Sequence, residues 1–187
     1  SGEIGPVRRI ETTMCIPLYR FADIRWQYDL AGGALMDVGC YAIHLLRTLA
    51  GEEPSVTRAR AWLRNPNVDR AVKAEFTFPS GVSGHIHCSM WSSTLLHLGA
   101  KVVGERGELT IRNPFVPQLY HRLSVRAAQG KRHEKFGETP TYNYQLAAFV
   151  TAVRTRGPFP TDMSDATANM RVIDAVYAAA GLPKRGA

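Results

Sequence analysis

RAVKAEFTFPSGVSGHIHCSMW, residues 70–91, alternates apolar and polar side chains in its first half and turns back at Pro79-Ser80-Gly81. Alternation with a period of two is typical of a half-buried strand, and Pro-Ser-Gly is a turn signal. The stretch therefore predicts a β-hairpin. The same criteria predict further strands over residues 6–18, 55–64, 95–103, 107–112 and 119–127.

Helical patterns lie on either side of these strands. Residues 34–50 carry no proline and end before Gly51, a residue type common just past a helix end. A second helix is expected from a Thr141 cap to about residue 156, and a third from a Ser164 cap to Gly181. Their predicted apolar stripes are Leu146, Phe149, Val150 and Val153 in one, and Met170, Ile173, Val176 and Tyr177 in the other.

Strands and helices are thus segregated along the chain, and the polar residues 128–139 read as a loop. Segregation predicts an α+β fold, in which a mostly antiparallel, open sheet is covered on one face by helices. A glycine-rich strand-to-helix turn of the GxGxxG kind is missing from the sequence, so we expect no Rossmann domain in residues 1–187.

Composition narrows the class of protein. The chain has 187 residues, of which 45% are hydrophobic and 21% charged, values that suit an ordinary globular domain. No apolar run approaches the roughly 18 residues of a membrane span, so no membrane association is expected. Three cysteines (Cys15, Cys40 and Cys88) are too few for a disulfide framework and favour a reducing, cytoplasmic setting.

The formal net charge is +7. An excess of positive charge can bind nucleic acid, an anionic membrane or an anionic small ligand. The Lys and Arg residues are scattered, however, and no groove-entering motif accompanies them. We therefore interpret them as a solvated basic surface and expect no nucleic-acid partner.

The helix predicted over residues 34–50 contains the candidate catalytic residues. Asp37, Tyr41 and His44 are spaced i, i+4 and i+7, which places a carboxylate, a phenol and an imidazole on one helix face. Gly32 and Gly33 precede the helix and let backbone or ligand approach closely, and Gly39 removes a side chain that could obstruct the polar face. A structural alternative is that Asp37 only suits the helix dipole, Tyr41 is a half-buried anchor and His44 a surface residue.

The string Gly-Gly-Ala-Leu-Met-Asp-Val-Gly-Cys-Tyr, residues 32–41, resembles the signature GGGxLxDxGxY of the glucose–fructose oxidoreductase/inositol dehydrogenase/MocA-like family. Five further segments resemble that family in the same order, so the resemblance covers roughly residues 5–183. These segments are Asp23–Trp26, Pro79–Val82, Gly104–Leu109 and the two terminal helices around residues 142–146 and 169–175.

The resemblance implies a two-domain NAD(P)-dependent oxidoreductase that transfers hydride to or from a sugar, polyol or diol. In that family an N-terminal Rossmann domain binds NAD or NADP and supplies a catalytic lysine. Residues 1–187 look like the substrate-binding and oligomerisation domain alone, without the N-terminal dinucleotide-binding domain. We therefore expect the isolated chain to be inactive and not to bind the cofactor tightly; its cofactor-binding residues stay unknown.

By the family pattern Tyr41 is the acid–base group, while Asp37 holds the lysine or orients a substrate hydroxyl. His44 binds a second hydroxyl or serves as the alternative base. Some members carry His at the Tyr41 position, so this chain is of the Tyr type, which makes an inositol-like substrate less certain. Arg25, Tyr142 and Gln145 are the candidate substrate-binding residues, because a guanidinium, a phenol and an amide can each hold an oxygen.

The sequence gives rise to three further expectations, on metal binding, on pairing of two copies and on a competing function. His85 and His87 share a strand face but lack a third ligand, so no metal site is expected. The uncovered sheet face, with Phe76, Phe78 and Trp91 as spare aromatic residues, predicts a homodimer through that face. A competing hypothesis is a non-catalytic sugar- or polyol-binding or dimerisation module without cofactor binding.

Overall fold

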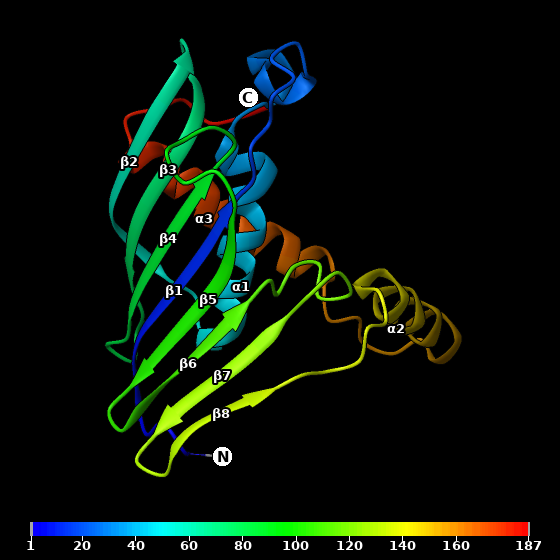
Figure 1. The fold of residues 1–187 in the computed structure, drawn as a ribbon. Helices are drawn as coiled ribbons and strands as arrows, with labels where there is room; N and C mark the ends of the chain where they lie inside the picture. Colours follow the sequence, from blue (N-terminus) through cyan, green and yellow to red (C-terminus); the bar gives the residue numbers. More distant parts are fainter. Residues whose placement is uncertain (1, 187) are drawn as a thin grey trace.

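The computed structural model describes residues 2–186 and is built around one eight-stranded sheet. Its strands run side by side in the order β2-β3-β4-β1-β5-β6-β7-β8 (Figure 1). The strands are β1 (Val7–Cys15), β2 (Ser55–Asn65), β3 (Val68–Thr77), β4 (Ser83–Ser89), β5 (His97–Gly104), β6 (Gly107–Arg112), β7 (Arg122–Ala127) and β8 (Gly130–Glu134). The first strand thus lies in the middle of the sheet.

Strand pairing is antiparallel except between β1 and β4, which run parallel. The expected mostly antiparallel sheet is therefore confirmed. The hairpin predicted over residues 70–91 is β3–β4, in which Ala74 lies opposite Ile86. A parallel pair needs a long crossover connection, and here the chain between β1 and β4 carries α1 and the strands β2 and β3.

One strand was not expected. Residues 128–139 were predicted to be a loop, yet β8 (Gly130–Glu134) pairs with β7 along the outer edge of the sheet. Its residues are charged or polar and largely exposed, so they show no apolar alternation. An edge strand of this kind obtains its hydrogen bonds from one neighbour only, and polar residues there discourage further pairing.

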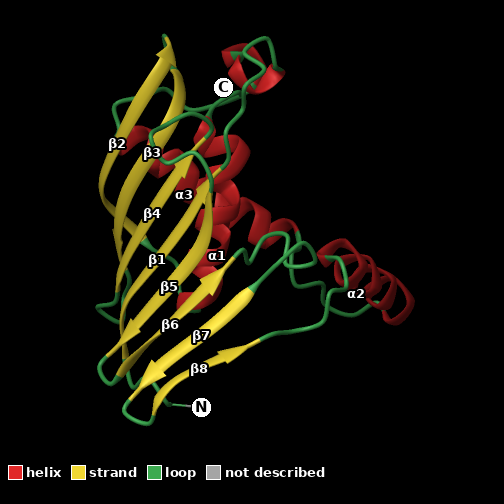
Figure 2. Ribbon diagram, in the orientation of Figure 1, coloured by secondary structure: helices red, strands yellow, loops and turns green. Residues whose placement is uncertain are grey.

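Two helices, α1 (Cys40–Ala50) and α3 (Met163–Ala179), cover one face of the sheet, as expected (Figure 2). Thr12 on β1 donates a hydrogen bond from its hydroxyl to the carbonyl of Ala42, at 2.8 Å, which identifies this face as the covered one. The core lies between the helices and the sheet. Its fully buried side chains include Ile10, Leu35, Ile43, Leu46, Val72, Ile173, Val176 and Tyr177.

The helix ends agree only in part with the predicted caps. Gly51 does end α1, with φ at 69°. The Thr141 cap was wrong: helix α2 (Thr141–Thr155) begins after Pro140, and no side chain caps it. The Ser164 cap was also wrong, because Asp162 caps α3 by accepting hydrogen bonds from the backbone N–H groups of residues 164 and 165. The carboxylate two residues earlier satisfies the free amides before the serine can.

Helix α2 stands clear of the sheet and of the other two helices (Figure 1). None of its residues is buried. The predicted apolar stripe therefore exists but stays largely exposed: Leu146 is 62% exposed, Phe149 53% and Val153 62%. Phe149 meets the ring of Phe159 edge-on, with centroids 5.9 Å apart. Periodicity correctly predicted the helix and could not show whether its apolar side has a partner.

The aromatic residues expected on the uncovered face lie elsewhere. Phe76 and Phe78 are 2% and 3% exposed and belong to the core under the helices. Phe76 is directly opposite Gly84 on β4, beside Leu46 of α1. Trp91 is half-buried and contacts the rings of Tyr19 and Phe21. The prediction assigned these rings to the wrong side, because alternation separates two faces without saying which one is covered.

The uncovered face is polar and basic. Residues paired across neighbouring strands point to the same side of a sheet, so the strand register identifies the residues of this face. Its charged members are nine cations, Arg9, Arg58, Arg60, Lys73, Lys101, Arg112, Arg122, Arg126 and Lys131, and three acids, Glu11, Glu75 and Glu108. Their net charge of +6 is close to the +7 of the whole chain. The basic residues that look scattered in the sequence are therefore gathered by the fold.

No helix among the described residues is both long and apolar enough to cross a bilayer.

Candidate active site

The segment that carries Asp37 is not a regular α-helix. Residues Leu35–Gly39 form a π-helical turn, η3, which leads without a break into α1. Turns of this type are rare and are often found at functional sites, because the wider turn re-aims its side chains. Asp37 and Tyr41 both remain solvent-accessible here, whereas Leu35 and Val38 are buried.

The glycines around the motif serve the packing of the protein itself. Gly33 has φ at 144°, and a Cβ there would lie 2.2 Å from Asp69 Oδ1. A Cβ on Gly39 would lie 2.8 Å from Leu35 Cδ1 and 2.9 Å from Cys88 Sγ. The group that approaches Gly33 closely is therefore the buried Asp69 carboxylate of the protein itself, and not a ligand. Gly39 brings the helix close to β4, rather than clearing the polar face as its position in the motif suggested.

A buried ionic network holds the start of this turn. Asp69 is fully buried, and its Oδ2 accepts a hydrogen bond from the backbone N–H of Leu35 at 2.7 Å. Its Oδ1 accepts from the Tyr177 hydroxyl at 3.0 Å and from Arg185 Nη2 at 2.9 Å. Arg185 also donates from Nε to the carbonyl of Gly32, at 3.0 Å. Strand β3, helix α3 and the C-terminal segment thus meet at the residues that precede Asp37.

This network was missed in the sequence. Lys184-Arg185 was interpreted as solvated surface, but the Arg185 side chain is 1% exposed and lies over the Tyr177 ring at 4.2 Å. A carboxylate on β3 and an arginine 116 positions later carry no local signal of pairing. Only the folded chain brings them together.

Arg25 lies between two carboxylates. Its Nε donates to Asp37 Oδ1 at 2.7 Å, and its Nη1 donates to Asp23 Oδ1 at 3.1 Å. Asp23 in turn caps the short helix η1 (Ile24–Trp26) through the Arg25 backbone N–H. The arginine predicted as a substrate anchor is therefore held beside Asp37, and about half of its side chain stays exposed to a ligand.

Tyr41 is 51% exposed, and its ring meets that of Phe115 edge-on, with centroids 6.5 Å apart. Burial of the rest of the side chain raises the pKa of Tyr41 above its ordinary value, and Cys40, Tyr142 and Asp37 act in the same direction. The positive charge of Arg25 acts the other way on this pKa. Asp37, Arg25 and Tyr142 therefore all lie close enough to Tyr41 to influence its hydroxyl.

His44 lies one turn further along and faces α3. Its Nδ1 is 3.4 Å from Asp165 Oδ2, and Asp165 also accepts a hydrogen bond from the buried Arg47, at 2.9 Å. Arg47 pairs in addition with Glu53 at 2.6 Å. The structure therefore engages His44 in a contact between α1 and α3, with 40% of its side chain exposed.

The two candidates on α2 differ in position. Tyr142, at the start of the helix, is 73% exposed and near enough to Tyr41 to act on its pKa. Gln145 is exposed on the second turn of the same helix. Four of the six predicted residues, namely Arg25, Asp37, Tyr41 and Tyr142, are thus brought together, although they come from three separate segments.

The two strand histidines lie on the uncovered face, where His85 is opposite Glu11 and His87 opposite Thr13. Within the described part of the chain, no three His, Cys, Asp or Glu side chains are grouped as a metal site requires.

The sequence profile of the GFO/IDH/MocA C-terminal domain matches residues 1–110. The chain belongs to this family. Among curated relatives, it is 32% identical over 198 residues to dTDP-3,4-didehydro-2,6-dideoxy-alpha-D-glucose 3-reductase of Streptomyces violaceoruber. It is 28% identical over 181 residues to D-xylose 1-dehydrogenase (NADP(+)) 2 of Haloferax volcanii. These alignments cover 98% and 96% of this GFO/IDH/MocA-type domain, but only 57% and 56% of the relatives.

Solved structures show the same fold. The aldose-aldose oxidoreductase of Caulobacter crescentus superposes with a TM-score of 0.87 at 23% identity, over 96% of this chain and 55% of that one. A 3-ketoreductase of Actinomadura kijaniata, solved with NADP and TDP-benzene, superposes with a TM-score of 0.84 at 23% identity. That superposition covers 95% of this chain and 55% of the ketoreductase chain. The domain therefore spans little more than half the length of the relatives it matches.

The Gly32–Gly33 pair does not fit the pyrophosphate of a dinucleotide. Pyrophosphate binding uses glycines that leave open space before the N-terminus of a helix. At the Gly32–Gly33 pair that space is taken by backbone oxygens of Arg25 and Gln27 and by the Asp69 carboxylate. The glycine pair therefore packs the domain against itself and offers no pyrophosphate site.

Proposed function

We propose that residues 1–187 form the substrate-binding and oligomerisation domain of an NAD(P)-dependent oxidoreductase that acts on a sugar, polyol or diol. The dinucleotide-binding domain of the longer protein would hold the cofactor. The observation that carries the proposal is the grouping of Tyr41, the Arg25–Asp37 ion pair and Tyr142 at the start of α1. Family membership and the sugar-acting relatives support the same assignment.

Tyr41 would exchange the proton with the reacting oxygen of the substrate. Its raised pKa keeps the phenol protonated at neutral pH, so the hydroxyl is ready to donate to a carbonyl oxygen. This protonation state favours the reductive direction. In the oxidative direction Tyr41 must first lose its proton, and a cation from the cofactor domain, such as the lysine implied by the family pattern, would lower its pKa.

The neighbouring side chains would orient the substrate. Arg25 can donate to a hydroxyl or carbonyl oxygen while its Nε stays on Asp37, because the guanidinium has five N–H groups in a planar fork. Tyr142 and Gln145 would bind further oxygens from the side of α2. His44 is the remaining polar group of the row, and we assign it to a more distant hydroxyl because Asp165 already engages it.

The proposal is tested on the longer protein with reduced nicotinamide and a panel of keto-sugars, sugars and polyols. Loss of nicotinamide absorbance with at least one carbonyl compound is expected, and the 187-residue chain alone should show none. Saturable binding of a sugar by calorimetry, without any turnover of NADH or NADPH by the longer protein, would contradict hydride transfer and support the non-catalytic module instead.

We further propose that two copies pair through the uncovered sheet face, since α1 and α3 both cover the opposite side. The face carries like charges, and salt shortens the Debye length from about 8 Å at 0.15 M to about 3 Å at 1 M. Light scattering should therefore give a species of twice the 20.7 kDa chain mass, more abundant at high salt. A single 20.7 kDa species at both salt concentrations would refute the pairing.

A further inference from the structure

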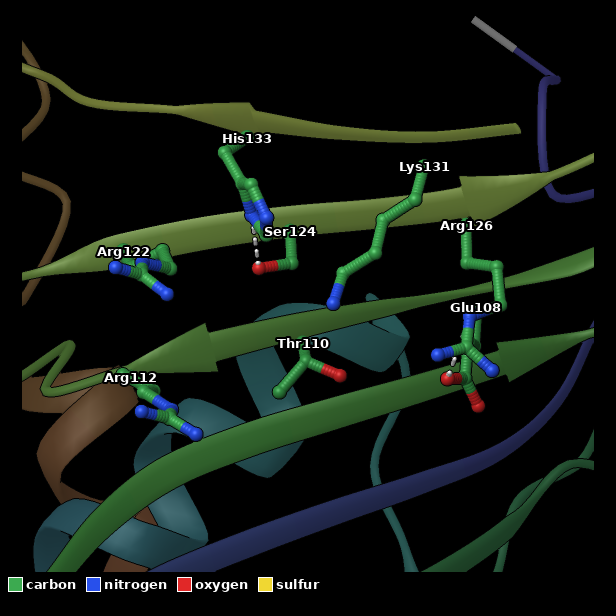
Figure 3. Close-up of a pocket in the computed structure, with 8 residues that line it drawn as sticks. All are labelled: Glu108, Thr110, Arg112, Arg122, Ser124, Arg126, Lys131 and His133. Carbon is green, nitrogen blue, oxygen red and sulfur yellow. Dashed lines mark hydrogen bonds and ion pairs between the residues drawn. The ribbon is translucent and has the colours of Figure 1, made fainter. Parts of the chain in front are cut away.

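The uncovered face has a hollow near its β8 edge. It has a volume of about 200 Å³ and is formed by residues of β6, β7 and β8 (Figure 3). The lining side chains are Glu108, Thr110, Arg112, Arg122, Ser124, Arg126, Lys131 and His133. The strand register explains the grouping, because Arg112 lies opposite Arg122, Thr110 opposite Ser124, and Ser124 opposite His133.

The cations of this hollow are poorly neutralised. Within residues 2–186, no carboxylate lies within ion-pairing distance of Arg112, Arg122 or Lys131. The one acid in the lining, Glu108, is already paired with Lys101 at 2.7 Å and lies 3.9 Å from Arg126 Nε. Four cations and one carboxylate leave the lining with a net charge of +3. Like charges placed this close destabilise the sheet unless something opposes them.

The hollow also presents hydrogen-bond donors. Ser124 Oγ is 2.8 Å from His133 Nδ1, so the hydroxyl can accept from the ring and donate to a ligand. Arginine side chains bind oxyanions through two parallel N–H groups, and the Arg112–Arg122 pair offers two such forks side by side. The face as a whole has a net charge of +6, which raises the local concentration of anions.

The size and polarity of the hollow define the ligand. A drug-sized or nucleoside ligand usually occupies about 300–1,000 Å³ lined mainly by apolar side chains, and this hollow is smaller and polar. We propose that it is a binding site for a small multivalent oxyanion of the pyrophosphate class. The site is separate from the grouping around Tyr41, and it does not depend on the proposed hydride transfer. It lies on the face through which we propose that two copies pair, so the test is made at low ionic strength, where the like charges of that face keep the copies apart.

The test is calorimetric titration of the 187-residue chain with inorganic pyrophosphate at low ionic strength. Saturable binding with one site per chain is expected, tighter than that of orthophosphate because more charge is neutralised. Arg122→Gln and Lys131→Gln should each weaken binding about tenfold or more. The matched control is Arg58→Gln, which removes the same charge from the same face at its opposite edge and should weaken binding less than twofold.

Three results would overturn the site. One is no binding by the unchanged chain. Another is an equal loss of affinity in the Arg58 and Arg122 variants, which would assign the attraction to the field of the whole face. The third is a DNA oligonucleotide that binds more tightly than pyrophosphate and is affected equally by both substitutions, which would indicate an extended nucleic-acid surface. Unchanged thermal melting of each variant shows that the fold is intact.

Discussion

Asp69→Ala is expected to lower the free energy of unfolding by about 3–5 kcal/mol, the usual cost of leaving one partner of a buried ion pair alone. Arg185 would remain buried at 1% exposure without its counter-ion, and the Leu35 N–H and the Tyr177 hydroxyl would lose their acceptor. A domain of this size loses roughly 2–4 °C of melting temperature per kcal/mol. The melting temperature should therefore fall by roughly 6–20 °C, as measured by thermal unfolding followed by circular dichroism.

Glu75→Ala is the matched control, because Glu75 lies on the same strand with an exposed side chain. This substitution should change the free energy of unfolding by no more than about 0.5 kcal/mol, as most surface substitutions do. Adding Arg185→Met to Asp69→Ala removes both charges and should recover part of the loss. If the Asp69→Ala and Glu75→Ala variants have the same melting temperature, the Asp69 network does not stabilise the fold as we propose.

Tyr41→Phe in the longer protein is expected to lower turnover at least tenfold, and by up to the roughly 10²–10⁴-fold that a positioned acid–base group contributes. The change removes one hydroxyl from a ring that is 51% exposed, so the melting temperature should not move. The substrate is held chiefly by other groups in our proposal, so KM should change less than kcat. Steady-state kinetics with reduced nicotinamide measures both.

The pH profile distinguishes a proton donor from a residue that only packs. Reduction needs the protonated phenol, so activity should fall as the pH rises through the pKa of Tyr41. Burial in this domain raises that pKa, and a lysine of the cofactor domain would lower it. That alkaline decrease should be absent from the residual activity of the phenylalanine variant. Tyr120→Phe, at 54% exposure, is the control and should keep both turnover and profile. Equal kcat values for Tyr41→Phe and the unchanged protein would remove Tyr41 from the mechanism.

Much of the fold could be predicted because it is encoded locally. The β3–β4 hairpin follows from alternation around a turn, and Gly51 ends α1 as its position suggested. The edge strand β8 escaped prediction since its side chains are polar on both sides. Alternation also could not assign Phe76 to the covered face, because that choice depends on where the helices lie.

In the candidate site, too, local spacing predicted some features and only the structure shows the others. The spacing of Asp37 and Tyr41 pointed to one polar face, and the structure adds Arg25 and Tyr142 from other segments. The assignment of Gly39 to that face was wrong, because its missing side chain makes room for Cys88. No local pattern could show this, since Cys88 lies on strand β4, far along the chain from Gly39.

The sequence by itself determined the α+β class, the strands of the central hairpins and the spacing of Asp37 and Tyr41, because periodicity and turns act between residues a few positions apart. Only the tertiary structure decided that Arg185 is buried against Asp69, that no residue of α2 is buried, and that nine cations share one sheet face. These features depend on contacts between residues far apart in the chain, and burial and charge are properties of the surfaces that such contacts create.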